Sequence, residues 1–245
     1  MQFSLKLALS GALLLSIILT PTTHAQLFDA LKREATKIAT GGSGGFSQDE
    51  AIKGIKEALT NGATKGTDIV SKLDGYYKNP AIKIPFPPEA QKVESAVRKI
   101  GLNKQADDAI LSMNRAAEDA AKSAKDIFIN AIKQMTVTDA MNIIKGDTSA
   151  ATTFLKRTTS ASLIEKFTPI IQASLEKVDA TKYWSTVINA YNKIPFQQKI
   201  NPDLTAFVTQ KALDGLFVMI AQEEGAIRRD PLARTSEILK KVFGK

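Results

Sequence analysis

The strongest constraint on the fold lies between Asp203 and Glu224, where apolar side chains recur around most of a helix. The apolar face consists of Leu204, Val208, Ala212, Leu216, Met219 and Ile220, and it is widened by Phe207, Leu213 and Phe217. A helix that is apolar around most of its circumference has to be surrounded by other helices. Its uncharged run, from Gly215 to Gln222, is much shorter than the roughly 20 residues that cross a bilayer. The stretch is therefore predicted to be the core helix of a bundle.

Helical spacing of apolar residues recurs along most of the chain, and no strand-like alternation persists. The other helices are expected at 27–40, 48–73, 89–100, 104–121, 123–135, 139–145, 149–178, 181–192 and 231–243. The segment 149–178 forms one or two helices, with a bend near Pro169. Helix starts are expected at Ser47 (with Glu50 completing a capping box), Thr138, and Asp230 followed by Pro231. The predicted fold class is all-α: a single multi-helix bundle with Pro-rich extended connections and no substantial sheet.

Two Pro-containing links, 79–88 and 194–202, interrupt the helical pattern. Each link carries large apolar side chains, which are Ile82, Ile84 and Phe86 in the first and Ile194 and Phe196 in the second. Exposing these side chains would gain nothing, so both links are predicted to pack in order against the bundle.

The first 25 residues have the layout of a secretory signal peptide: an early Lys6, an apolar stretch from Leu7 to Leu19, and the small-residue ending Thr23–Ala25. The alternative is a membrane anchor, but the apolar stretch is short for a span. Three regions follow: signal peptide 1–25, an N-terminal helix with a Gly-rich linker over 26–46, and a helical domain over 47–245. We expect a periplasmic or secreted protein, cleaved near Ala25–Gln26, with no stable membrane span afterwards.

Composition excludes several chemistries. The chain has no Cys, and its one His lies in the expected signal peptide, so imidazole bases, thiol nucleophiles, disulfides and conventional zinc sites are unavailable. The formal net charge is +8, but no run of five basic residues occurs and few aromatic residues lie among the basic ones. A nucleic-acid partner therefore has little support. No catalytic residue, metal or cofactor is assigned.

Two polar clusters lie among small and apolar residues. Asn114 and Glu118 are one helical turn apart, with Arg115 within reach of Glu118. Lys211 and Asp214 are three residues apart on the predicted core helix. Neighbouring alanines and a glycine allow two helices to approach closely here, so these five residues are predicted to form a polar network shared by adjacent helices. A structural role and ligand binding both remain open for it.

Five ordered segments carry a family resemblance: NPAIKIPFP (79–87), MNRAAE (113–118), FINAIKQMTVTDAMNIIKGD (128–147), FVTQKALDGLFVMIAQEE (207–224) and IRRDPLARTSEILKKVFG (227–244). Together they resemble the domain-of-unknown-function family 4197 of exported bacterial proteins, from about Leu27 to Gly244. The resemblance implies an all-α domain in the bacterial envelope, and it supplies no activity, substrate or catalytic residue. The matched polar positions are Asn114, Arg115, Glu118, Lys133, Thr136, Asp139, Thr209, Gln210, Lys211, Asp214, Glu223, Arg228, Arg229 and Thr235.

Three kinds of function fit these observations. The favoured one is a non-enzymatic binding or scaffold protein of the envelope, with an envelope protein as partner. The second is a carrier whose helices enclose an apolar small molecule or lipid. The third is an enzyme that uses carboxylates and lysine, with candidates Glu118, Asp139, Lys211, Asp214 and Glu223.

The N-terminal pattern yields the first prediction. Because the segment reads as a cleaved signal, N-terminal sequencing of the protein made in a bacterial host should begin at Gln26 or within a few residues of it. An intact Met1 terminus recovered in the membrane fraction would contradict export by cleavage.

Overall fold

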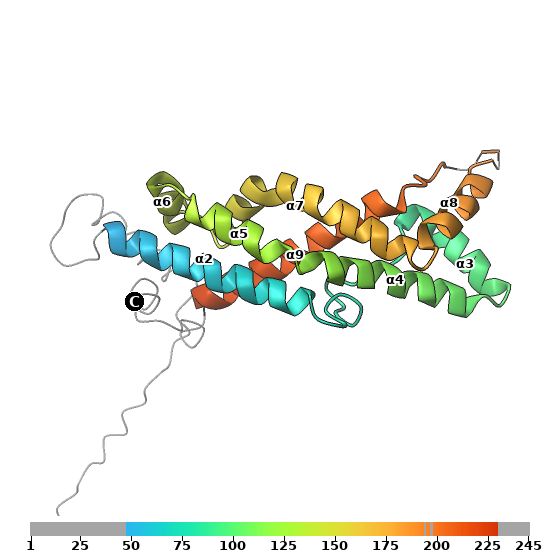
Figure 1. Cartoon of the computed structure of the whole chain (residues 1–245), viewed down its shortest axis with the longest axis horizontal. Helices are drawn as coiled ribbons and strands as arrows, with labels where there is room; N and C mark the ends of the chain where they lie inside the picture. The colour runs from blue at the N-terminus through green and yellow to red at the C-terminus, as the bar shows by residue number, and fades with distance from the viewer. Residues whose placement is uncertain (1–47, 194, 197, 230–245) are drawn as a thin grey trace, which may run out of the picture.

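The computed structural model describes residues 48–193, 195–196 and 198–229, and these residues form an α-helical bundle without strands (Figure 1). The helices are α2 (Gln48–Val70), α3 (Gln91–Lys99), α4 (Asn103–Ala121), α5 (Ala124–Lys133), α6 (Val137–Lys145), α7 (Ala150–Glu176), α8 (Ala180–Tyr191) and α9 (Leu204–Arg229), with a 3-10 turn η1 at Pro88–Ala90. The predicted all-α class is confirmed. The helix expected at 27–40, the Ser47 cap and the helix after Asp230 lie outside the described residues.

Helix α9 is the centre of the bundle and packs against α2, α4, α7 and α8. It is the one described helix long and apolar enough to cross a membrane, a test that core helices of globular proteins also pass. Here its apolar side chains are buried by the surrounding helices. For example, the ring of Phe217 packs edge-on against Phe128 of α5, with 6.0 Å between the ring centroids. The core-helix prediction is confirmed, and the helix continues past Glu224 to Arg229.

The bundle is elongated, and its long helices lie roughly along one axis (Figure 1). Helices α2 and α7 run in one direction, and α9 returns in the other between them. Helix α6 lies at the end where α2 begins, whereas α3 and α8 lie at the opposite end. Helix α7 is continuous through Pro169, so 149–178 forms one helix rather than two.

The start of α6 corrects one sequence prediction. Thr136 is the N-cap rather than Thr138, because its hydroxyl accepts a hydrogen bond from the Asp139 backbone N–H and the Asp139 carboxylate accepts one from the Thr136 N–H. This reciprocal pair satisfies two backbone donors at once, which a cap at Thr138 would leave open.

The first Pro-containing link packs as predicted. Ile82, Ile84 and Phe86 are buried, and the Phe86 ring lies 5.8 Å from the ring of Trp184 of α8.

The second link differs from the prediction. The side-chain amide of Asn192 donates to the Ile200 carbonyl and accepts from the Ile200 N–H, both at 2.8 Å. Ile200 is the residue that becomes buried, while Phe196 is fully exposed at 106%. The prediction that Phe196 packs on the bundle is therefore wrong, and Ile194 lies outside the described residues.

The close contact between α9 and the loop after α2 depends on Gly215. A Cβ atom at Gly215 would lie 2.6 Å from Cε1 of Tyr76, a ring that is fully buried. The Tyr76 hydroxyl is also fixed, because it donates to the Ala212 carbonyl at 2.5 Å. The ring therefore cannot move aside for an added methyl group.

Gly215→Ala should destabilise the fold by about 1–3 kcal/mol, because overpacking outweighs the better helix propensity of alanine. Gly62→Ala in α2 is the matched control, since a Cβ there meets only ordinary contacts at 3.6 and 3.7 Å. That variant should be neutral or more stable by up to about 1 kcal/mol. Urea denaturation of both variants measures the difference, and equal stabilities would refute the contact argument.

Candidate functional site

The predicted polar residues of α4 bind the backbone of the loop that joins α2 to η1. Asn114 is fully buried, and its amide accepts from the Ile84 N–H at 2.9 Å and donates to the Ile84 carbonyl at 2.8 Å. This is the hydrogen-bond pattern that a neighbouring strand would provide. We call Asn114, Arg115 and Glu118 the α4 clamp.

Glu118 forms the second half of the α4 clamp. One carboxylate oxygen accepts from the backbone N–H groups of Tyr76 and Tyr77, both at 3.1 Å. The other oxygen accepts from Arg115 at 2.6 Å, and Arg115 also donates to Asp74 at 2.6 Å. A buried carboxylate is stabilised when its oxygens accept hydrogen bonds in this way. Both oxygens of Glu118 therefore take part in holding the loop.

Two residues beside the α4 clamp have shifted pKa values. Hydrogen bonds from Lys78 and then Arg115 lower the pKa of Asp74. Its ion pairs therefore stabilise the fold at neutral pH, and this contribution is lost as the pH falls through the lowered pKa. Burial, followed by the charge of Glu118, raises the pKa of Tyr76. Tyr76 thus stays protonated and continues to donate to α9.

Lys211 and Asp214 do not join the α4 clamp among the residues that the structure describes. Lys211 is exposed, and the half-buried Asp214 accepts from Gln210 at 3.0 Å. The reason is the position of Tyr76, which lies between α4 and α9 and fills the contact where a direct charge pair was predicted. Helices α4 and α9 are adjacent as predicted, but a tyrosine connects them instead of a shared ion pair.

The other acidic candidates lie on separate parts of the bundle. Asp139 completes the cap of α6 and also pairs with Arg157 at 3.2 Å. The hydrogen bonds from Thr136 lower its pKa. Glu223 pairs with Lys65 of α2 at 2.7 Å. Each of these two carboxylates therefore has a structural partner.

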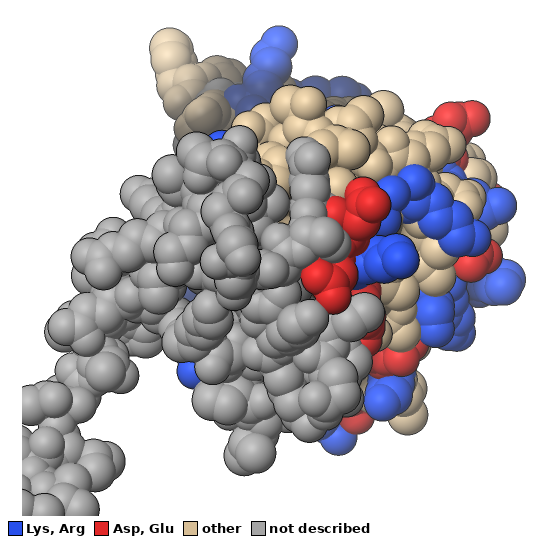
Figure 2. All heavy atoms as spheres, turned by 90° about the vertical axis from the view of Figure 1, so that its left-hand side faces the viewer, with Lys and Arg blue, Asp and Glu red and all other residues tan. Residues whose placement is uncertain are grey.

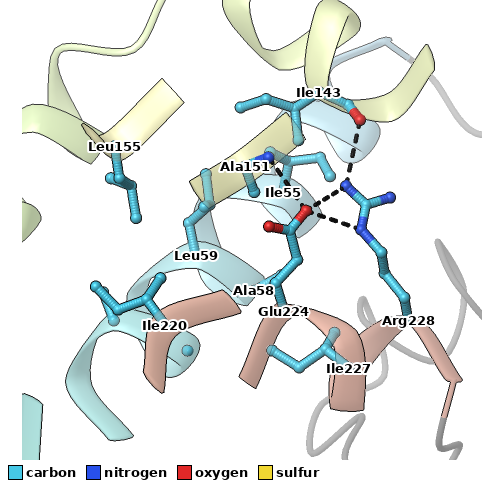
Figure 3. A pocket seen from close by; sticks show the side chains of 12 residues that line it. Ile55, Ala58, Leu59, Ile143, Ala151, Leu155, Ile220, Glu224, Ile227 and Arg228 are labelled. Atoms are coloured by element: carbon cyan, nitrogen blue, oxygen red, sulfur yellow. Dashed lines mark hydrogen bonds and ion pairs between the residues drawn. The ribbon is translucent and has the colours of Figure 1, made fainter. Parts of the chain in front are cut away.

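A buried ion pair that the sequence prediction missed lies near the C-terminal end of α9 (Figure 3). Glu224 accepts from the backbone N–H groups of Ala151 and Thr152 at 3.1 and 2.9 Å, and from the Thr152 hydroxyl at 2.7 Å. Arg228 donates to the same carboxylate at 2.8 and 3.0 Å. Because Ser149 makes no side-chain cap, Glu224 serves as the cap of α7 from another helix.

This ion pair borders a small apolar cavity of about 30 Å³. Its lining residues come from α2, α6, α7 and α9: Ile55, Ala58, Leu59, Gly62, Ala63, Ile143, Ala151, Leu155, Ile220, Glu224, Ile227 and Arg228. The volume is enough for one or two water molecules and far too small for a lipid chain.

A wider groove of about 510 Å³ lies between α7 and the start of α9. Its lining is mostly polar and uncharged, and it consists of Ile164, Thr168, Gln172, Asp203, Thr205, Ala206, Thr209 and Gln210. The buried Thr209 hydroxyl has no hydrogen-bond partner among the described residues. The groove thus combines polar and apolar lining, with threonine and glutamine side chains from both helices.

Two sequence signals could have revealed what was missed. Glu224 and Arg228 are four residues apart, a spacing that pairs side chains on a helix, but the helix was expected to end at Glu224. The tetrapeptide KIPF occurs twice, at 83–86 and 193–196, in the two Pro-containing links. It marks two loops of related composition, each held by the side-chain amide of an asparagine.

The family model described as "Protein of unknown function (DUF4197)" matches residues 45–244. The chain belongs to this family. No curated protein and no solved structure matches the chain.

The geometry of the α4 clamp gives a test of coupling. Glu118→Gln should cost about 1–3 kcal/mol, because the substitution weakens a buried acceptor and removes the charge opposite Arg115. Asp119→Asn is the control on the next residue, where the exposed pair with Lys122 contributes about 0–1 kcal/mol. Urea denaturation gives both values.

A double-mutant cycle then separates the two arrangements. Glu118→Gln and Arg115→Met should couple by more than about 0.5 kcal/mol, because the side chains bond directly. Glu118→Gln and Lys211→Met should be additive within about 0.5 kcal/mol. Strong coupling to Lys211 would restore the shared network predicted from the sequence.

Proposed function

We propose that this member of the DUF4197 family is an exported, non-enzymatic binding or scaffold protein of the bacterial envelope. The observation that carries the proposal is the use of the interior polar groups. Asn114, Glu118 and Glu224 all bind backbone groups of a loop or a helix start. Polar side chains that hydrogen-bond to the backbone in this way make a scaffold rigid. They are not available as acids or bases for a substrate.

The two alternatives receive less support. An enzyme built on Glu118, Asp139 and Glu223 would have to release these carboxylates from the partners that hold the fold. A carrier of an apolar molecule would need a larger apolar space than the cavity of about 30 Å³ beside Glu224. A rigid bundle that binds its partner through the outer surface requires neither the release of these carboxylates nor a larger cavity.

Photo-crosslinking in living cells tests the proposal. The full chain is produced in a Gram-negative host with a photoreactive phenylalanine analogue at Tyr183 of α8 or, as a control, at Lys53 of α2; both residues are exposed. We expect the processed protein in the envelope fraction and a crosslink to an envelope component from position 183 that is absent from position 53. A chain that stays unprocessed in the cytoplasm, or crosslinks equally at both positions, would refute the proposal.

A further inference from the structure

Helix α8 lies at one end of the bundle (Figure 1). This helix and the link after it carry apolar side chains that the fold does not cover. Tyr183 and Val187, one turn apart on α8, are 64% and 42% exposed. Phe196, in the link that follows, is fully exposed. We call these three residues the α8 tip. An adjacent side of α8 buries Trp184 and Ile188 in the core, so the helix has more apolar surface than the bundle covers.

Phe196 is held in a conformation that costs free energy. Its φ angle is +63°, in the left-handed region that aromatic residues rarely adopt. The two hydrogen bonds between Asn192 and Ile200 close the loop that presents it. Because the exposed ring makes no compensating contact within the described residues, stability alone does not explain a phenylalanine here.

Four lysines lie on the chain around the α8 tip. Between positions 176 and 203 there are four lysines (Lys177, Lys182, Lys193 and Lys199) and three acidic residues (Glu176, Asp179 and Asp203). All four lysines are exposed, and none has an ion-pair partner among the described residues. Asp203 is engaged at the start of α9, where it accepts from the Ala206 N–H at 2.9 Å.

The other end of the bundle provides a contrast. Figure 2 shows acidic and basic side chains intermixed on the surface at the end where α2 begins. Mixed charges of this kind repel neither sign of partner strongly and attract neither. Exposed aromatic and aliphatic side chains next to unpaired lysines instead match a surface that is anionic outside and apolar beneath.

We propose that the α8 tip docks on an anionic phospholipid surface, with Tyr183, Val187 and Phe196 entering the interfacial region and the flanking lysines facing the phosphates. This inference rests on the proposed envelope function and specifies its partner. A single small apolar contact gives reversible binding, so the protein would associate with the membrane surface without spanning it.

Vesicle binding of the exported, processed protein tests the proposal. We expect binding to vesicles of phosphatidylglycerol and phosphatidylethanolamine, weak binding to phosphatidylcholine, and loss of binding as salt rises. Phe196→Asn should weaken binding about tenfold, since it removes a large apolar group. Lys182→Glu should weaken it as well. The controls are Leu73→Asn, another exposed apolar residue, and Lys53→Glu on α2, and both should bind as the unchanged protein does.

Thermal melting distinguishes a docking role from a structural one. Asn tolerates the left-handed region, so Phe196→Asn should melt at the same or a higher temperature while it loses binding. If Phe196→Asn unfolds, Tyr183→Ser and Lys182→Glu decide the question. Unchanged vesicle binding by these variants would overturn the proposal. A protein crosslinked through Tyr183, without vesicle binding, would keep the envelope function and assign the α8 tip to a protein partner instead.

Discussion

The structure depends on the burial of α9. Its apolar side chains cover most of its circumference, so α2, α4, α7 and α8 pack around it and leave an exposed stripe that includes Lys211 and Val218. Burying each large side chain is worth roughly 1.5–3 kcal/mol, so this helix contributes substantially to the stability of the fold. The close approach of its neighbours is possible because small residues lie at the contacts, as Gly215 does beneath the ring of Tyr76.

Burial of this kind creates a second requirement, because loops and helix ends packed on the core contain backbone groups that water no longer reaches. The bundle meets it with side chains from distant helices. Glu118 accepts hydrogen bonds from the N–H groups of Tyr76 and Tyr77, and Glu224 accepts them from the N–H groups at the start of α7. Arg115 and Arg228 neutralise these two carboxylates at a distance of one helical turn. The same arrangement thus occurs twice in the bundle.

The sequence predicts the fold more completely than the site. Periodicity locates the helices because each helix buries one apolar face, and the residues of that face recur at helical spacing in the sequence. It also groups Asn114 with Glu118, which are neighbours on one helix. It could not identify their partners, because the Ile84 amide and the Tyr76 and Tyr77 amides belong to the main chain, which every residue has. Nor could it place Tyr76 between α4 and α9, since this depends on how the loop folds back. The sequence therefore predicts Lys211 as a partner of Glu118, whereas Tyr76 bonds to both helices at this contact.

The two KIPF segments show why exposure is decided by surroundings. Phe86 and Phe196 follow the same three residues, yet one is buried and the other is fully exposed. Phe86 packs against Trp184, a large aromatic side chain of α8 that is buried in the core. Asn114 also holds Ile84, two residues before Phe86, to α4. In the second link, Asn192 holds Ile200 instead, and Phe196 is fully exposed. A phenylalanine that follows the same three residues is thus a core residue in one loop and a surface residue in the other. The bundle provides an aromatic neighbour for the first ring, whereas the second ring packs against none of the described residues.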